Sequence, residues 1–318
     1  MKRRLLALAL GAVVLLGCGA PGEEAAPAAT QAPAAIEEPA VTEAPAPVKT
    51  EEPTLEAEPP KPEDKIVQIT LDEVRIPNGE RTVYGKIYGP KTEGRHPAVI
   101  LSHGYNGTNG DWVKECTLYA QNGFVACAID FCGGSTRSKS SGKSTDMTIT
   151  SEKEDLLAVF DYVRALENVD ADKVVLFGGS QGGLVSALAA AERPEQVRAL
   201  GLYFPAFCVP DDWKKKYNTP ADAPESFDFW GLQLGRGFVE DVFGLDVFGT
   251  IGAYEGPVLI LHGTNDAIVP FTYSEDAVDE VYETAELMLL PGEGHGFSPK
   301  GAQTAMETIL HFLNDTCR

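Results

Sequence analysis

Six short, mostly apolar runs alternate with longer stretches of helical periodicity, and this alternation constrains the fold of the chain more than any other feature. A strand that is apolar on both faces must be covered on both sides. Such strands, separated by helices, predict an α/β fold in which a mostly parallel sheet lies between two layers of helices. The runs span residues 98–101, 124–129, 174–177, 199–204, 258–261 and 286–290.

The chain immediately before these runs has a strand pattern of another kind. Residues 65–77 and 81–88 alternate apolar and polar side chains around Pro77-Asn78-Gly79, which is a turn signal. These two segments predict an antiparallel hairpin ahead of the parallel strands. Helices are expected at residues 182–192, 270–283 and 304–313, and after a capping box at residues 151–154.

The first 17 residues have the organisation of a processing signal. Three basic residues precede a twelve-residue apolar run at positions 5–16. A membrane span needs roughly 18 to 20 apolar residues, so this run favours a secretory signal peptide over a span or a buried helix. The segment Leu15-Leu16-Gly17-Cys18 resembles the bacterial lipobox, which implies that the signal is cut before Cys18 and that this thiol is lipid-modified.

Residues 18–64 predict a solvated tether between that anchor and a folded domain. From position 19 onward they hold ten of the 22 prolines and eleven acidic residues, against only Lys49 and Lys61 as bases. Such a composition buries too little apolar surface to offset the entropy of ordering it. We therefore expect a protein held to a bacterial membrane, on its extracytoplasmic face, by a lipid anchor, with residues 65–318 as one globular domain.

Charge and cysteine content exclude several classes of partner. Residues 65–318 carry 36 acidic and 21 basic side chains, so we expect no nucleic-acid partner. Five cysteines remain after Cys18, at spacings that match no zinc motif, and no disulfide can be assigned from the sequence. We expect no metal site and no cofactor.

The alternation of strands and helices is interrupted at about residues 205–254. This stretch holds a large share of the aromatic residues of the chain, including Trp213 and Trp230. A long insertion in a compact domain is usually functional, and we expect a lid over a site. A small structural subdomain is the simpler interpretation, and it is compatible with a lid.

Ser180 lies in the pattern Gly-x-Ser-x-Gly, which it forms with Gly178 and Gly182. The pattern alone is weak in a chain with 32 glycines, but here it follows an apolar strand and opens a helix. In that setting a tight turn lifts the serine hydroxyl clear of the sheet, and small neighbours let the backbones approach closely. Ser180 is therefore the candidate nucleophile.

A serine hydroxyl needs a base, and the chain has five histidines. His295 follows the last strand in a glycine-rich loop at the carboxyl ends of the strands, so it is the candidate base. Asp266, just past the preceding strand, is favoured over Glu293 as the carboxylate that orients it. Asp130 is expected to anchor a loop. The other histidines are expected at surface, packing or turn positions: His96, His103, His262 and His311.

Stabilising a developing oxyanion needs two backbone N–H groups, each worth roughly 3 kcal/mol. Gln181, directly after the candidate nucleophile, should supply one of them. Tyr105, in the loop after the first parallel strand, should supply the other, and its ring can also line an acyl pocket.

The order Ser180, Asp266, His295 along the chain resembles that of the α/β-hydrolases. This resemblance covers about residues 66–315. It implies the fold of that superfamily: a mostly parallel, twisted sheet with helices on both faces.

Further motifs are similar to those of the bacterial cinnamoyl and feruloyl esterases: residues 107–112, Asp130-Phe131, residues 146–148 and the Ser-Gln-Gly-Gly turn at Ser180. The chain departs from that subfamily at Gly179, where a histidine is usual, and at Cys132, where asparagine or arginine is usual. Neither position belongs to the candidate triad.

The resemblance implies a serine esterase that acts by acylation and deacylation. The expected substrates are hydroxycinnamoyl esters, either small molecules or derived from plant polymers. A serine peptidase of the same fold that acts on short peptides is the first alternative. A catalytically silent lipoprotein that binds a ligand in the same cleft is the second.

Overall fold

The computed structural model describes residues 67–317. The expected signal peptide, the lipidation site at Cys18 and the expected tether lie outside the described residues. Within residues 67–317, none of the helices combines the length and the apolar character that crossing a membrane requires.

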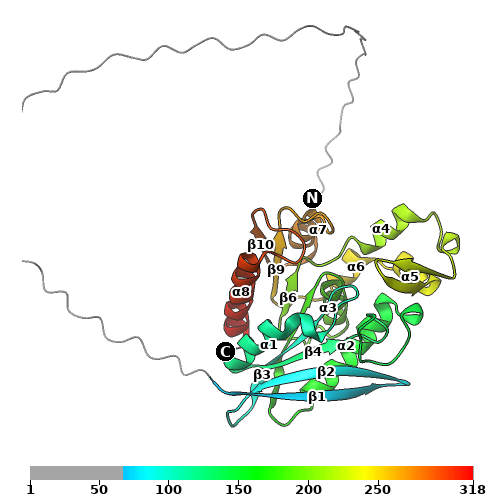
Figure 1. Ribbon diagram of the computed structural model, residues 1–318. Helices are drawn as coiled ribbons and strands as arrows, with labels where there is room; N and C mark the ends of the chain where they lie inside the picture. The colour runs from blue at the N-terminus through cyan, green and yellow to red at the C-terminus, as the bar shows by residue number, and fades with distance from the viewer. Residues whose placement is uncertain (1–66, 318) are drawn as a thin grey trace, which may run out of the picture. The chain divides into compact units, whose positions relative to one another are not determined.

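An eight-stranded sheet forms the centre of the described domain (Figure 1). Its spatial order is β1-β2-β4-β3-β5-β6-β9-β10, in which β1 with β2 and β2 with β4 pair antiparallel and the other neighbours pair parallel. The predicted α/β fold with an N-terminal antiparallel hairpin is confirmed. The strands are β1 (Ile69–Asn78), β2 (Arg81–Pro90), β3 (His96–Ser102), β4 (Val125–Asp130), β5 (Val169–Gly179), β6 (Leu200–Tyr203), β9 (Val258–Gly263) and β10 (Ala285–Leu290).

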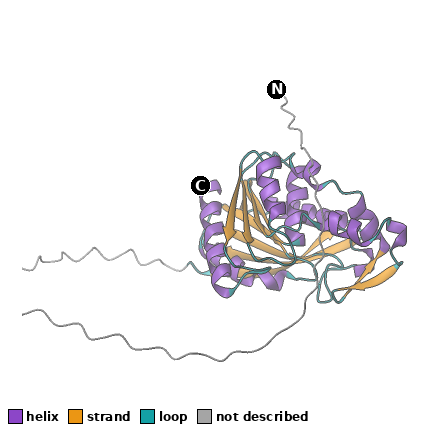
Figure 2. Ribbon diagram, turned by 90° about the horizontal axis from the view of Figure 1, so that it is seen from above, coloured by secondary structure: helices purple, strands orange, loops and turns teal. Residues whose placement is uncertain are grey.

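Helices cover both faces of this sheet (Figure 2). Along β3, Ala98 and Ile100 belong to the apolar layer on one face, and Val99 and Leu101 belong to the layer on the other. Because burying an aliphatic side chain is worth about 1.5–3 kcal/mol, these layers are the main source of stability. The first layer includes α2 (Ile149–Arg164) and α3 (Gln181–Glu192), and the second includes α1 (Val113–Gln121) and α8 (Pro299–Cys317).

The inserted segment, residues 205–254, contains a two-stranded sheet of its own (Figure 1). Its hairpin turns at Trp230 and Gly231, whose φ angles of 47° and 80° suit a two-residue turn between twisted strands. Aromatic rings pack around Trp213: Tyr217, Phe227, Phe229 and Phe238. The elements of the segment are α4 (Val209–Lys216), β7 (Ser226–Phe229), β8 (Leu232–Gly235), α5 (Arg236–Phe243) and α6 (Val247–Ile251).

Short helical turns connect the larger elements. They are η1 (Asn109–Trp112), η2 (Ser144–Asp146), η3 (Pro220–Asp222), α7 (Thr272–Asp276) and the π-turn η4 (Ala277–Val281). The helix expected at residues 270–283 is therefore shorter than expected and continues as a π-turn.

The start of α2 differs from expectation. The capping box expected at residues 151–154 lies three residues earlier, because Thr148 is the N-cap. Thr148 Oγ1 accepts a hydrogen bond from Ser151 N–H (3.0 Å), and Ser151 Oγ accepts one from Thr148 N–H (2.9 Å). Glu152, the second residue of the expected capping box, thereby lies in the first turn of α2 and on its buried face.

Candidate active site

Ser180 lies at the tight turn between β5 and α3, in a backbone conformation that non-glycine residues rarely adopt. Its φ is 54° and its ψ is −123°, a strained geometry of the kind that costs of order 1–3 kcal/mol. Two backbone hydrogen bonds hold the turn: Ser180 N–H donates to Tyr203 O (2.9 Å), and Gly183 N–H donates to Ser180 O (3.0 Å). The turn fixes the serine at the carboxyl end of the parallel strands.

The two glycines of the Gly-x-Ser-x-Gly pattern are required by close backbone contacts. A Cβ atom on Gly182 would collide with the carbonyl oxygens of Ser102 and His103, which end β3 and begin the next loop. A Cβ atom on Gly178 would collide with the carbonyl oxygen of Gly182. Any larger residue at either position would push the turn away from β3.

The structure brings Ser180, His295 and Asp266 into one hydrogen-bonded chain. His295 Nε2 lies 3.1 Å from Ser180 Oγ, and His295 Nδ1 lies 2.8 Å from Asp266 Oδ2. The carboxylate accepts the Nδ1–H, so Nε2 is left free to accept the serine proton. The side chain of Asp266 is fully buried, whereas that of His295 is 19% exposed.

The environment of Asp266 keeps its carboxyl ionised. Burial alone would raise its pKa, but hydrogen bonds outweigh burial and lower the pKa below its ordinary value. Val269 N–H and Ile268 N–H each donate to Asp266 Oδ1 at 2.9 Å, and His295 donates to Oδ2. A permanent negative charge therefore lies behind the imidazole at neutral pH.

Both segments expected to form an oxyanion hole lie at Ser180. Gln181 is the first residue of α3, so its backbone N–H has no partner inside the helix. The loop after β3 runs directly beside the serine, because a Cβ atom on Gly104 would lie 3.1 Å from Ser180 Cβ. Tyr105 follows in that loop, and its phenol donates to Phe229 O (2.7 Å), which joins the loop to the inserted segment.

Two further histidines are buried and neutral. Burial lowers the pKa of both His103 and His262. His103 Nε2 accepts from Phe131 N–H (3.0 Å), which holds the loop after β4. His262 Nε2 donates to Val269 O (3.0 Å) and lies 3.3 Å from Asp266 Oδ2, so it supports the carboxylate. This supporting role of His262 was not predicted, and the one signal for it is the position of His262 at the end of the strand that precedes Asp266.

Two other acidic residues hold loops. Asp130 Oδ1 accepts from Asn109 N–H (2.8 Å), and its Oδ2 accepts from Lys139 N–H (2.8 Å). Glu293 accepts from the hydroxyl of Ser298 (2.7 Å). Each carboxylate is thus occupied by loop contacts rather than by His295.

Ser180 opens into a cleft of about 690 Å³ whose lining combines aromatic side chains with the charged Asp111, Lys114 and Glu115. This volume lies within the range of about 300–1,000 Å³ that is typical of small-molecule sites. Ser180 and His295 form part of its surface together with the following aromatic side chains: Tyr105, Trp112, Tyr203, Phe204, Trp230 and Phe297.

A second, narrower chamber of about 90 Å³ lies under the inserted segment. It is lined by Gln181, Trp213, Phe229 and Phe238 among others. Ser180, Tyr105, Trp230 and Ile268 line both spaces, so the serine lies where they meet. Trp230, at the hairpin tip, is 64% exposed and stacks on Phe229 with ring centroids 4.7 Å apart.

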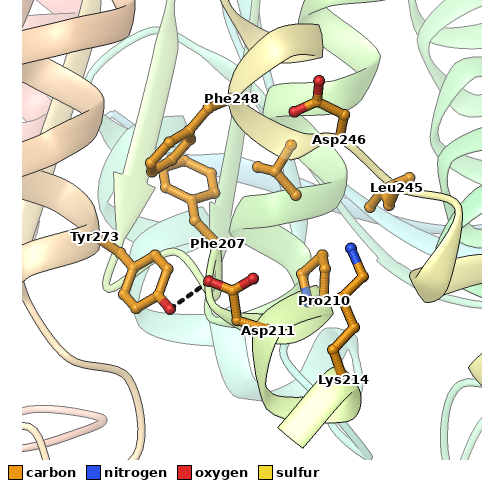
Figure 3. Close-up of a pocket in the computed structure, with 9 residues that line it drawn as sticks. Phe207, Pro210, Asp211, Lys214, Leu245, Asp246, Phe248 and Tyr273 are labelled. Carbon is orange, nitrogen blue, oxygen red and sulfur yellow. Dashed lines mark hydrogen bonds between the residues drawn. The ribbon is translucent and has the colours of Figure 1, made fainter. Parts of the chain in front are cut away.

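A third cavity, of about 240 Å³, shares no lining residue with the Ser180 cleft (Figure 3). It contains no serine, cysteine or histidine that could act as a nucleophile or base. Tyr273 and Asp211 point toward each other across it, and the Tyr273 hydroxyl donates to Asp211 Oδ2 (2.7 Å). This bond connects α7 to α4 of the inserted segment.

Within the described part of the chain, no cluster of three or more His, Cys, Asp or Glu side chains could hold a metal ion. The five cysteines of this part are unpaired and buried. Burial raises the pKa of the Cys127 thiol to about 12, so it stays protonated at neutral pH. Ser180 is therefore the side chain with the geometry of an activated nucleophile.

Known proteins of similar sequence and structure define the class. Fold, site and relatives together make this chain a serine hydrolase of the α/β-hydrolase fold. Residues 112–318 match the model of the prolyl oligopeptidase family, and the chain belongs to that family.

Individual relatives are named as ester hydrolases or were solved with an aromatic acid. The bifunctional esterase/perhydrolase DCH of Acinetobacter calcoaceticus is 25% identical over 73% of this chain and 95% of its own length. The mitochondrial palmitoyl-protein thioesterase ABHD10 of Pongo abelii is 26% identical over 71% of this chain and 74% of its own length. The structure of Est1E from Butyrivibrio proteoclasticus with bound ferulic acid matches with a TM-score of 0.70, at 26% identity, over 76% of this chain and 98% of that chain.

Proposed function

We propose that this chain hydrolyses carboxylic esters through an acyl-enzyme, with hydroxycinnamoyl esters as its substrate class. The observation that carries the proposal is the hydrogen-bonded chain from Ser180 Oγ through His295 to the buried Asp266, at the junction of two aromatic chambers. In the same proposal Ser180, His295 and Asp266 are the catalytic residues.

Acylation follows from this geometry. Ser180 Oγ attacks the ester carbonyl carbon while His295 Nε2 takes the hydroxyl proton. The negative charge on the carbonyl oxygen is held by the backbone N–H groups of Gln181 and Tyr105, and Asp266 stabilises the imidazolium. The intermediate then breaks its bond to the alcohol oxygen, which receives the proton from His295 and leaves.

Deacylation repeats these steps with water as the nucleophile. His295 takes one proton from the water as its oxygen attacks the acyl carbon, and the same N–H groups hold the second oxyanion. Breaking the bond to Ser180 Oγ returns the proton to the serine and releases the carboxylic acid. The balance needs no cofactor.

The chamber walls and the relatives support an aromatic acyl group. Tyr105, Trp213, Phe229 and Trp230 offer flat apolar surfaces within reach of Ser180. Aromatic pairs in offset or edge-to-face contact gain about 0.5–1.5 kcal/mol beyond the area that they bury. The similar protein Est1E was solved with ferulic acid, which is an aromatic acid of the hydroxycinnamic type.

A serine peptidase is the second candidate, because the matching family is that of prolyl oligopeptidase. Hydrolysis of methyl ferulate and of p-nitrophenyl acetate, compared with that of aminoacyl p-nitroanilides, separates the two. We expect turnover of the esters and none of the anilides, with all turnover absent in Ser180→Ala. Preferential cleavage of the anilides would assign the peptidase function, and failure of the folded protein to turn over any of these compounds would favour a silent ligand-binding role.

We also propose that a lipid on Cys18 holds the protein on the extracytoplasmic face of a bacterial membrane. The lipobox-like Leu15-Leu16-Gly17-Cys18 supports this. Cys18→Ala should shift the protein from the membrane fraction to the soluble extracytoplasmic fraction. Its retention in the membrane fraction would contradict the proposal.

A further inference from the structure

The side chain of Gln181 is anchored below the active site by a buried carboxyl group. Gln181 is 4% exposed, and its Nε2 donates to Glu152 Oε2 at 2.7 Å. Glu152 lies in the first turn of α2 and is 1% exposed. The bond therefore joins the first turn of α2 to the first residue of α3, whose backbone N–H is assigned to the oxyanion.

No cation neutralises Glu152 in the described part of the chain, since its carboxylate is in none of the ion pairs found there. Its other oxygen, Oε1, lies beside Gly134 and the neutral ring of His103. A Cβ atom built on Gly134 would be 3.0 Å from Glu152 Oε1 and 3.4 Å from His103 Cε1. The charged groups that raise the pKa of Glu152 are both negative: Asp155 lies on the same helix, and Asp241 lies on α5. The phenol of Tyr105, from the loop after β3, is a further titratable neighbour.

We propose that Glu152 is a positioning residue of the oxyanion hole: by holding the side chain of Gln181, it fixes the Ser180–Gln181 peptide whose N–H faces the substrate oxyanion. The inference rests on the proposed serine-hydrolase function and deepens it. A donor at this place stabilises the transition state only if it is already oriented when charge develops. The strained φ of Ser180 favours such an anchor in addition to the backbone hydrogen bonds of the turn, because any relaxation of the turn would rotate the peptide.

The protonation state of Glu152 gives the oxyanion hole a pH dependence. Burial raises its pKa to about 8, the hydrogen bond from Gln181 opposes this rise, and Asp155 and Asp241 add to it. At neutral pH the carboxyl is therefore mainly protonated and uncharged. Above about pH 8 it ionises, and a buried negative charge beside the oxyanion hole disfavours the oxyanion.

The same protonation affects folding. The pKa of this acid is higher in the folded protein than its ordinary value of 4.5, so the folded state binds the proton more tightly. Protonated Glu152 therefore adds to the free energy of unfolding. This stabilising contribution is fully present below about pH 4.5 and is lost as the pH rises through about 8. Glu152→Gln removes this dependence, because an amide does not ionise.

The test compares the full chain with Glu152→Gln, Glu152→Leu and Asp155→Asn, from about pH 6 to about pH 10, which brackets the relevant ionisations. Asp155 is the matched control: it is a fully buried carboxylate one turn further along α2, and it binds Asn78 and Cys132 rather than Gln181. The readouts are kcat and KM for p-nitrophenyl acetate, the rate of labelling by a fluorophosphonate, and unfolding by urea.

Glu152→Leu should lower kcat about ten- to a hundred-fold with little change in KM. This loss is smaller than the roughly 10²–10³-fold loss in kcat that is typical when an oxyanion donor is removed outright, because the Gln181 N–H is still present but less well oriented. Glu152→Gln keeps an oxygen that accepts from Gln181 Nε2, so it should retain most of the activity at pH 7. It should also lack the fall in kcat above about pH 8 that the unaltered chain shows. Asp155→Asn should lower stability, leave kcat at pH 7 in place and keep the alkaline fall, moved to lower pH because Asp155 helps to raise the pKa of Glu152.

Unchanged kcat in folded Glu152→Leu would overturn the inference, as would an equal loss of kcat in Asp155→Asn. If Glu152→Leu does not fold, the pH profile of Glu152→Gln decides alone, and an alkaline fall that persists in it overturns the inference. An unaltered chain that neither hydrolyses the ester nor reacts with the fluorophosphonate would instead refute the proposed function, together with the inference that depends on it.

Discussion

The loops that follow β5, β9 and β10 and the inserted segment border the same cleft, but different forces hold them. The loops are held by backbone hydrogen bonds, such as Asn265 N–H to Glu293 O (2.8 Å) and Ser180 N–H to Tyr203 O (2.9 Å). Their backbones also touch: a Cβ atom on Gly263 would collide with the Glu293 carbonyl oxygen.

The inserted segment is held mainly by its aromatic side chains. Rings pack around Trp213, and hydrogen bonds to the rest of the domain include Tyr105 to Phe229 O, Thr150 to Asp241 and Tyr273 to Asp211. Backbone contacts leave little room for atoms to shift, whereas packed rings can be exchanged for others of similar volume. We infer that the loops determine the chemistry and the inserted segment determines which substrate reaches it.

The largest predicted effect lies in the loops. In Asp266→Asn the side-chain oxygen must keep accepting from Ile268 and Val269, so the amide NH₂ faces His295 Nδ1 and forces the wrong tautomer. We expect kcat to fall by about 10⁴-fold, as in serine proteases with the same change. The matched change in the inserted segment, Asp211→Asn, should alter kcat by less than about two-fold. Similar losses in both variants would remove the distinction between the regions.

Glycine substitutions sharpen the same contrast. A Cβ atom in Gly182→Ala collides with two backbone carbonyls, so we expect the free energy of unfolding to fall by about 1–3 kcal/mol and kcat to fall with it. Gly237, in α5, has open space around its Cβ position, and Gly237→Ala should stabilise the protein by up to about 1 kcal/mol. Urea unfolding of both variants measures this, and a neutral Gly182→Ala would show that the turn is looser than its contacts indicate.

Trp230 tests the proposed role of the inserted segment in recognition. Because it is 64% exposed, Trp230→Ala should change the free energy of unfolding by less than about 0.5 kcal/mol. The substitution removes the ring from the lining of both chambers, so KM for methyl ferulate should rise about ten-fold. A ten-fold rise corresponds to a loss of about 1.4 kcal/mol in binding free energy. The kcat for p-nitrophenyl acetate should stay unchanged. Equal losses on both esters would assign Trp230 to the chemistry instead.

The smallest effect is expected at the bond between α7 and α4. Tyr273→Phe removes the hydroxyl that donates to Asp211, which should lower the free energy of unfolding by about 0.5–1.5 kcal/mol. Limited proteolysis should then cut faster within residues 205–254, while kcat for p-nitrophenyl acetate is unchanged. A fall in kcat would mean that this bond also positions the loops.

The sequence predicted those parts of the molecule that depend on local patterns. Apolar runs identified the strands, and the glycines around Ser180 reported backbone contacts that the structure contains. The geometry brings Ser180, Asp266 and His295 together because the parallel strands β5, β9 and β10 place the loops after them at one edge of the sheet. Their catalytic roles remain predictions that the experiments above address.

The parts that were not predicted depend on tertiary packing. The hairpin at Trp230 was not predicted, because the inserted segment was recognised only by its aromatic content. Helix α1 was not predicted either, because charged and polar residues interrupt its apolar positions. Glu152 was predicted only as a member of the capping box at residues 151–154. Its spacing from Leu156 and Val159, four and seven residues on, is the signal that places it on the buried face of α2.

Fluorophosphonate labelling followed by peptide mapping shows whether Ser180 is an activated nucleophile, because the reagent reacts with an activated serine whatever the natural substrate is. We expect one adduct on Ser180, its absence in Ser180→Ala, and much slower labelling in His295→Gln, while the exposed control Ser226→Ala labels normally. Absence of an adduct on the folded chain, or an adduct on another residue, would show that Ser180 is not the nucleophile.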